Sequence, residues 1–156
     1  MTHPRTRARE LALQYLYMDD MLHGKDVGSF DGYLAGQTPP LDAPVADYAR
    51  RLVESVLARR DELDGQIAAV ALNWKVTRMA AVDRNILRLG LAELTAWPET
   101  PYKVVINEAV ELARRYSSEE ACAFVNGVLD RLRLRHRGPT DAAPSGAAGE
   151  GRNSAG

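Results

Sequence analysis

Apolar residues recur at every third or fourth position along most of this chain, and no other feature restricts its fold as strongly. In an α-helix this spacing places them on one side, where they can face a common core. No segment shows the alternation of apolar and polar residues that is typical of a strand. The sequence therefore predicts an all-α protein, a compact bundle of about six or seven helices.

The same repeat identifies the residues expected in the core. In the first helix they are Ala8, Leu11, Ala12 and Tyr15. In four later helices they are Val45, Tyr48, Ala49, Leu52, Val53, Val56 and Leu57; Val82, Ile86, Leu89 and Leu94; Val105, Ala109, Leu112, Ala113 and Tyr116; and Ala121, Val125, Val128 and Leu132. Two further helices are expected, from about Asp61 to Leu72 and, briefly, from Phe30 to Leu34.

Capping residues and prolines mark the expected helix ends. Asp42 is a plausible cap for the helix that has Pro44 in its first turn. Thr77 and Thr100 are expected to open the two helices that Pro98 separates. Ser117 and Glu120 have the spacing of a capping box, in which each side chain bonds a free backbone amide, so they are expected to start the last helix.

The last twenty residues differ from the rest in composition. Residues 137–156 contain five of the 12 glycines, two prolines and no large apolar residue. Such a segment cannot bury enough surface to offset the entropy of ordering it. We therefore expect a folded domain over residues 1–136 and a disordered tail over 137–156.

Several classes of protein are disfavoured by what the chain contains. No apolar run approaches the roughly 20 residues of a membrane helix, and a cytosolic location is expected. His3, His23 and His136 show no metal-ligand spacing, and Cys122 falls beside a core stripe, where a buried thiol is the simpler interpretation. The sequence thus predicts no enzyme, no metal and no cofactor.

Arg5, Arg7 and Arg9 crowd the start of the first helix. Cations near a helix N-terminus oppose its dipole, so the helix gains nothing from them, and phosphate is a natural external partner. Steps of four residues place Arg5 and Arg9 on a row with Leu13 and Tyr17, apart from the core-facing stripe. The alternative is an arm whose charges are merely solvated.

Two features near the C-terminus are less informative. Arginines alternate at positions 131, 133, 135 and 137, where the end of a helix favours positive charge for structural reasons alone. Gly127 lies inside the predicted last helix, which implies a close approach by a neighbouring helix or by a ligand. Phe124, expected to be half exposed, could stack on a base.

Four segments together resemble one family. They are RARELALQYLY at 7–17, VDRNILRLGLAEL at 82–94, PYKVVINEAVELA at 101–113 and FVNGVLD at 124–130. In this order and spacing they are similar to the signature blocks of NusB, a family of bacterial transcription antitermination factors. The resemblance covers about residues 5 to 135.

This resemblance implies a fold, two partners and a function. The fold would consist of two small packed helical subdomains. The partners would be NusE, a small-subunit ribosomal protein, and boxA RNA, within an antitermination complex on RNA polymerase that promotes transcription of ribosomal RNA. The family allows both monomers and homodimers.

The resemblance also implies site residues. Those expected to bind RNA are Arg5, Arg7 and Arg9, with Lys103, Phe124 and Asn126 in the later blocks. Those expected to face NusE are Tyr17 and Asp83, both predicted to lie at the surface.

Two other functions remain open. The chain could be a NusB-like domain related to ribosomal RNA cytosine methyltransferases, or a helical scaffold with no role in RNA binding. We expect a stand-alone factor, because its 156 residues hold no methyl-donor-binding α/β segment and no glycine loop after a strand.

Overall fold

The computed structural model describes residues 3–72 and 75–139 of the 156. The helices of this part are α1 (Pro4–Met21), α2 (Phe30–Ala35), α3 (Ala43–Ala58), α4 (Arg60–Val70), the short 3-10 helix η1 (Val76–Arg78), α5 (Ala81–Ala96), α6 (Tyr102–Tyr116) and α7 (Glu119–Arg137). No strand occurs among these residues, which confirms the all-α prediction. None of the described helices is both long and apolar enough to cross a membrane.

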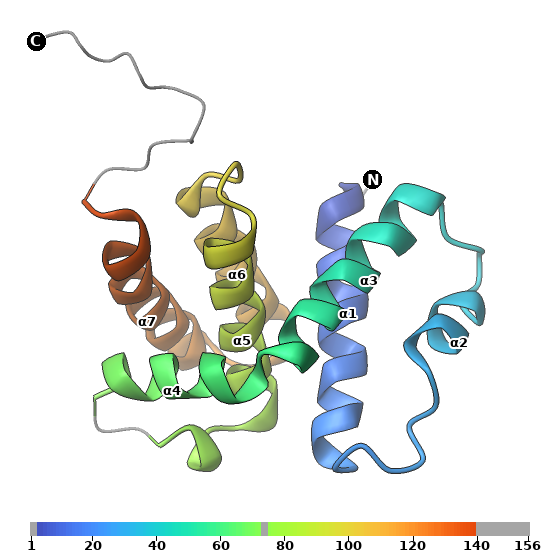
Figure 1. Cartoon of the computed structure of the whole chain (residues 1–156), viewed down its shortest axis with the longest axis horizontal. Helices are drawn as coiled ribbons and strands as arrows, with labels where there is room; N and C mark the ends of the chain where they lie inside the picture. Colours follow the sequence, from blue (N-terminus) through green and yellow to red (C-terminus); the bar gives the residue numbers. More distant parts are fainter. Residues whose placement is uncertain (1–2, 73–74, 140–156) are drawn as a thin grey trace, which may run out of the picture.

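The helices form two groups that share α5 (Figure 1). On one side α1 and α3 pack along each other, with α2 against them; on the other side α6 and α7 pack together, with α4 across the base. The α5 helix contacts α1, α3, α4, α6 and α7. Every residue of α5 from Asn85 to Leu94 is buried, as expected for a helix covered on all sides.

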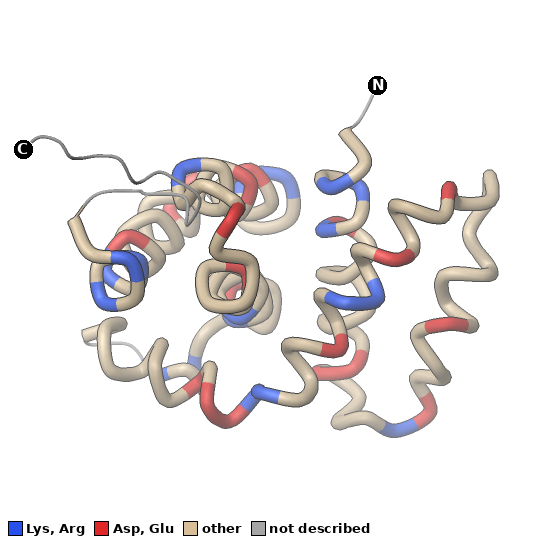
Figure 2. The backbone as a smooth tube through the Cα atoms, turned by 45° about the horizontal axis from the view of Figure 1, so that its top comes forward, with Lys and Arg blue, Asp and Glu red and all other residues tan. Residues whose placement is uncertain are grey.

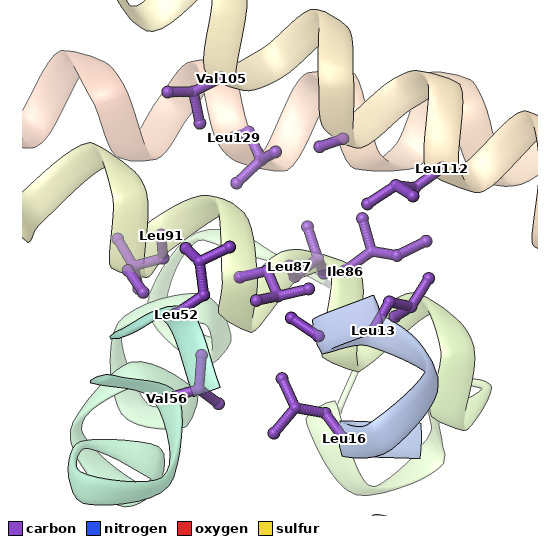
Figure 3. Close-up of a cluster of buried hydrophobic side chains, with 14 of the residues drawn as sticks. Leu13, Leu16, Leu52, Val56, Ile86, Leu87, Leu91, Val105, Leu112 and Leu129 are labelled. Carbon is purple, nitrogen blue, oxygen red and sulfur yellow. The ribbon is translucent and has the colours of Figure 1, made fainter. Parts of the chain in front are cut away.

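Buried leucines fill the space around α5 (Figure 3). Its side chains Ile86, Leu87 and Leu91 meet residues of both groups, which include Leu13, Leu16, Leu52, Val56, Leu112 and Leu129. The predicted stripes of the first and last helices are buried in full, and so are most residues predicted elsewhere. Leu57 and Tyr116 are corrections, because they are 40% and 38% exposed. Each lies at the end of its helix, where the helix projects past the core.

Three predicted helix starts are displaced. Thr77 lies in η1, and α5 begins only at Ala81. Thr100 is buried one position before Pro101, the residue that precedes α6. Ser117 ends α6, so Ser118 takes the N-cap of α7, where its hydroxyl accepts a hydrogen bond from the Ala121 amide at 3.0 Å. The capping-box prediction was therefore wrong by one residue.

The α4 helix also differs slightly from its predicted range. It ends at Val70, whereas the prediction extended it to Leu72. Leu72 has a positive φ of 59°, a left-handed conformation that a helix cannot continue through. Asp42 does occupy the N-cap position of α3, although its side chain makes no capping hydrogen bond.

The close helix approach predicted at Gly127 occurs at Gly90 instead. A Cβ added to Gly127 would meet only the Arg131 Nη1 atom, at an ordinary 3.7 Å. A Cβ added to Gly90 would lie 2.8 Å from Cδ1 of Leu129, so α5 and α7 can pack this closely only because residue 90 has no side chain. The structure therefore excludes one of the two explanations for Gly127, the close approach of a neighbouring helix.

The end of α7 is fastened to the end of α5. Arg137 donates hydrogen bonds to the carbonyl oxygens of Leu94 at 3.1 Å, Trp97 at 3.1 Å and Thr100 at 2.6 Å. The ordered fold thus includes Arg137, the first residue of the segment predicted to be a tail. Residues 140–156 of that segment lie outside the described residues, and its predicted disorder stays a prediction.

Candidate nucleic-acid interface

The first two turns of α1 carry the arginine cluster (Figure 2). His3 caps the helix, because its Nδ1 accepts a hydrogen bond from the Arg5 amide at 3.1 Å. No acidic residue lies in the first turn. The three arginines nevertheless have different surroundings, since Arg9 is only 4% exposed, whereas Arg5 and Arg7 are partly exposed.

Arg9 forms a buried two-bond ion pair with Glu93 of α5. Its Nε and Nη2 atoms donate to the two carboxylate oxygens of Glu93, both at 2.8 Å, and Nη1 reaches Glu108 of α6 at 3.3 Å. Tyr48 of α3 donates its hydroxyl hydrogen to Glu93 at 2.6 Å. Burial lowers the pKa of Arg9, but the hydrogen bond and charge of Glu93 raise it, and the net shift is upward.

The row of residues predicted to lie outside the core is therefore wrong at two positions. Arg9 and Leu13 are both buried, because α5 packs against this side of α1 and Glu108 of α6 reaches Arg9. Arg9 consequently joins α1 to α3, α5 and α6 from within. In this structure it holds the cluster in place, whereas Arg5 and Arg7 present charge to solvent.

Arg5 lies over the ring of the same tyrosine. Its guanidinium carbon is 4.5 Å from the centre of the Tyr48 ring, and Nη1 donates to the Thr100 hydroxyl oxygen at 3.4 Å. No carboxylate of the described residues forms an ion pair with Arg5. Burial and the Glu93 carboxylate hold the pKa of Tyr48 well above its usual value, so the phenol stays neutral and the charge of Arg5 is uncompensated.

Arg7 shares an acid with another arginine. Its Nη1 atom lies 3.3 Å from Glu10, and Glu10 also pairs with Arg115 of α6. One carboxylate between two guanidinium groups leaves a net positive charge. A pocket of about 410 Å³ opens next to Arg5, between the start of α1 and residues 99–104. The start of α1 is thus a hollowed surface at which Arg5 and Arg7 are partly exposed, with Glu99 and Glu108 also lining the pocket.

The other predicted RNA-binding residues fall in two places. Lys103 is exposed in the first turn of α6, next to Val104, which lines the pocket at Arg5. Phe124 is half buried, as expected, and lines a different pocket of about 460 Å³ together with Asp83. Asn126 is exposed on α7. The structure therefore brings Phe124 together with a residue predicted to face NusE.

The residues predicted to face NusE lie at the surface to different extents. Tyr17 is 38% exposed, and its hydroxyl has no hydrogen-bond partner within the described part of the chain. Asp83 is only partly exposed, and its carboxylate accepts a hydrogen bond from the Ser117 hydroxyl at 2.7 Å. The surface position of Tyr17 is confirmed, and that of Asp83 holds in part.

Sequence reasoning missed the groups that organise the arginine cluster. Tyr48 was assigned correctly to the core, but its contact with Arg5 depends on how α1 and α3 cross. Glu93 could have been noticed in the sequence, because apolar residues precede and follow it directly, and the structure leaves it only 2% exposed. A buried carboxylate requires a partner, and Arg9 was a candidate.

The fold and this surface define a class: an all-α protein with a cationic surface at the start of its first helix, suited to an anionic polymer. Comparison with known proteins then identifies the family. The NusB family model matches residues 6–133, and a transcription antitermination protein NusB from Anaeromyxobacter dehalogenans is 46% identical over 132 residues, covering 85% of this chain and 92% of that protein. This chain belongs to the NusB family, whose members are transcription antitermination factors.

Other relatives and solved structures agree. The NusB protein of Acidothermus cellulolyticus is 43% identical over 142 residues, covering 91% of this chain and 95% of that protein. NusB of T. maritima superposes with a TM-score of 0.78 at 32% identity, covering 87% of this chain and 94% of the other. A crystal structure of antitermination factors NusB and NusE in complex with dsRNA matches with a TM-score of 0.76 at 30% identity, covering 86% and 99%.

Proposed function

We propose that this antitermination factor binds boxA-type RNA together with the ribosomal protein NusE, and thereby promotes transcription of ribosomal RNA. The observation that carries the proposal is the likeness to a NusB chain solved with NusE and dsRNA, which extends over 86% of this chain. The partly exposed arginines at the start of α1, Arg5 and Arg7, also support the proposal.

Arg5 and Arg7 are the proposed primary contacts to RNA phosphates. Both are partly exposed, and Arg5 is held in place by Tyr48 and Thr100, so little side-chain entropy is lost on binding. Arg9 is proposed to contribute indirectly, by holding the start of α1 in place through its buried ion pair with Glu93. Lys103 adds a charge beside the same pocket, while Phe124 and Asn126 are proposed to contact bases farther along the strand.

NusE is proposed to bind at the surface that contains Tyr17 and Asp83. The free hydroxyl of Tyr17 can pair across an interface, and the pocket at Asp83 and Phe124 can receive a side chain. Because Phe124 lines that pocket, RNA and partner would meet there. Shared contact of this kind couples the two binding events, and the coupling must be reciprocal.

We infer a binding role and not an enzymatic one. Cys122 is buried, and its thiol lies 3.4 Å from the Ser118 carbonyl oxygen and 3.6 Å from that of Val110, which places it away from any substrate. His3 caps a helix, and His23 lies in a loop. Neither the methyltransferase-related domain nor the scaffold without RNA is favoured by a specific observation.

The experiment is a titration of labelled boxA RNA with this protein, alone and then with saturating NusE. We expect weak binding alone and at least about tenfold tighter binding with NusE, a coupling of roughly 1.4 kcal/mol. Asp83→Lys should reduce the effect of NusE by charge reversal, with little loss of stability. Equal RNA affinities with and without NusE would contradict the proposal.

Arg5→Ala and Arg7→Ala together test the RNA surface. Each lost phosphate contact should flatten the log–log salt dependence of binding by about 0.7. The helical signal and melting temperature should stay close to those of the parent protein, because neither residue is part of the buried pair. An unchanged salt slope would remove the start of α1 from the interface and would favour the scaffold alternative.

A further inference from the structure

Arg51 of α3 lies on the same aromatic platform as Arg5. Its guanidinium carbon is 5.8 Å from the centre of the Tyr48 ring and 5.9 Å from that of Trp97. The two rings meet edge to face, with their centres 5.6 Å apart. One platform made by α3 and the end of α5 therefore supports two arginines that come from different helices.

The charge of Arg51 is not used within the fold. No ion pair or hydrogen bond links its side chain to any residue of 3–72 or 75–139. The adjacent Arg50, in contrast, donates to Asp31 at 2.7 Å and to Asp47 at 2.9 Å. Asp47, the acid one turn before Arg51, is thus taken by its neighbour. Arg51 is exposed and is held mainly by the two rings.

We propose that Arg51 is a further RNA-binding residue, and that the RNA backbone passes from the start of α1 over the Tyr48–Trp97 platform to α3. This inference rests on the proposed function, because it extends the surface that begins at Arg5. The helices α1 and α3 pack side by side, and basic positions of both adjoin in Figure 2. Two fixed, uncompensated guanidinium groups suit successive phosphates of one strand.

The platform also determines what kind of contact is made. Tyr48 and Trp97 are 3% and 7% exposed, so their faces are already covered and cannot stack on bases. Recognition at this place falls to the guanidinium groups, which bind phosphate without regard to sequence. Arg51 therefore contributes affinity and not specificity. Its loss should weaken binding to boxA RNA and to an unrelated single strand by the same factor.

The test compares Arg51→Ala with Arg50→Ala, two variants that remove one positive charge from neighbouring positions of one helix. Each is titrated with boxA RNA and with a scrambled strand of equal length, over a series of salt concentrations. Arg51→Ala should weaken both complexes by about threefold to tenfold and flatten the salt slope by about 0.7. Arg50→Ala should weaken both complexes less than Arg51→Ala does, because it removes a compensated charge and acts only by releasing Asp47 near Arg51. Arg51→Lys should retain most of the salt slope, because it retains the charge.

The outcomes separate this inference from the function on which it rests. If Arg5→Ala weakens RNA binding but Arg51→Ala does not, the strand does not reach α3 and the inference is overturned. The same holds if Arg50→Ala and Arg51→Ala weaken binding equally, or if Arg51→Ala impairs only the binding of NusE. If neither Arg5→Ala nor Arg51→Ala affects RNA binding, the proposed RNA surface itself fails.

Discussion

The two ends of α1 are both held by ion pairs, but with the signs reversed. At its start, α1 supplies arginines, and carboxylates come from α5 and α6. At its end, α1 supplies Asp19 and Asp20, and arginines come from α4 and α5. Charges of these signs oppose the helix dipole at both ends, so contacts with other helices must offset their cost.

At the end with the aspartates, which we call the closed end, the charges of the ion-pair network are balanced. The Asp20 carboxylate accepts hydrogen bonds from Arg84 at 2.6 and 3.0 Å, Asn85 at 2.8 Å and Arg88 at 3.1 Å. Arg88 in turn makes two bonds to Asp64, both at 2.7 Å. Each of these arginines has a carboxylate, and the network is nearly neutral.

At the end with the arginines, which we call the open end, some positive charges have no ion-pair partner among the described residues. Glu93 and Glu108 compensate Arg9, but no described carboxylate forms an ion pair with Arg5 or Arg51. Similar chemistry thus gives two results on one helix. Where charges balance, the network joins helices; where positive charge is left over, the same kind of network also presents a binding surface.

The largest effect is expected from Glu93→Gln, which removes the acid that supports the open end. Arg9 would lose its buried two-bond partner and keep only the longer contact with the partly exposed Glu108, and breaking a buried pair costs about 3–5 kcal/mol. The measurement is the free energy of unfolding in urea. Tyr48→Phe serves as a control, because it removes one hydrogen bond to Glu93 without changing any charge, and its cost should be smaller. A loss below about 1 kcal/mol for Glu93→Gln would mean that this pair does not hold α1.

Asp20→Asn should have a smaller effect, confined to stability. The variant keeps the shape of the side chain but weakens charged hydrogen bonds, each worth about 1.5–3 kcal/mol, and Arg88 keeps Asp64 as a partner. RNA affinity and its salt slope should stay unchanged, since this network lies at the other end of α1 from the proposed RNA surface. A fall in RNA affinity in a variant that is still folded would break the distinction between the two ends.

The closed end should also respond to acid. Burial alone would raise the pKa of Asp20, but hydrogen bonds from Arg84 and Asn85 and the charges of Arg84 and Arg88 outweigh it and lower that pKa. Asp20 therefore stabilises the fold above the pKa of an unfolded aspartate, about 3.9, and this contribution disappears as pH falls through the lowered value. The stability difference between the parent and Asp20→Asn should be constant near pH 6 and shrink below about pH 4. A difference that grows in acid would contradict the assignment.

The smallest effect is expected from Glu99→Gln at the open end. Glu99 is exposed and lines the pocket next to Arg5, where its charge repels phosphate. Its removal should tighten RNA binding by about twofold, in keeping with the modest energies of exposed charges. Asp61→Asn, which removes an exposed carboxylate of α4, is the control and should leave RNA affinity unchanged. Equal gains in both variants would indicate a general charge effect.

The fold was largely predictable because each helix carries its own apolar stripe. That argument assumes one buried side per helix, and it succeeded for Ala121 and Leu132 of α7. It failed for α1, which is covered from two directions, so Arg9 and Leu13 were placed outside the core. No pattern within α1 itself could correct this, since its partner Glu93 lies 84 residues after Arg9.

The sequence allowed us to predict which arginines cluster at the candidate site, but not which acids and aromatic rings they contact. Charge crowding identified Arg5 and Arg7 from the sequence. Arg51 was not predicted, because the sequence alone does not separate it from its equally charged neighbour Arg50. The structure separates them, since Arg50 bonds Asp47 whereas Arg51 lies against Trp97. Which arginine is compensated depends on tertiary contacts, and a helical repeat does not contain that information.

A ribosome makes α1 well before Arg137, although the fold ties both of them to Thr100. The Arg137 side chain holds the Thr100 carbonyl, and the Thr100 hydroxyl meets Arg5. At about 5–20 residues per second, the 37 residues that separate Thr100 from Arg137 take roughly 2 to 7 s to add. The growing chain therefore displays its arginines for seconds before Arg137 can hold the loop beside them, and we expect full RNA affinity only after Arg137 has been added.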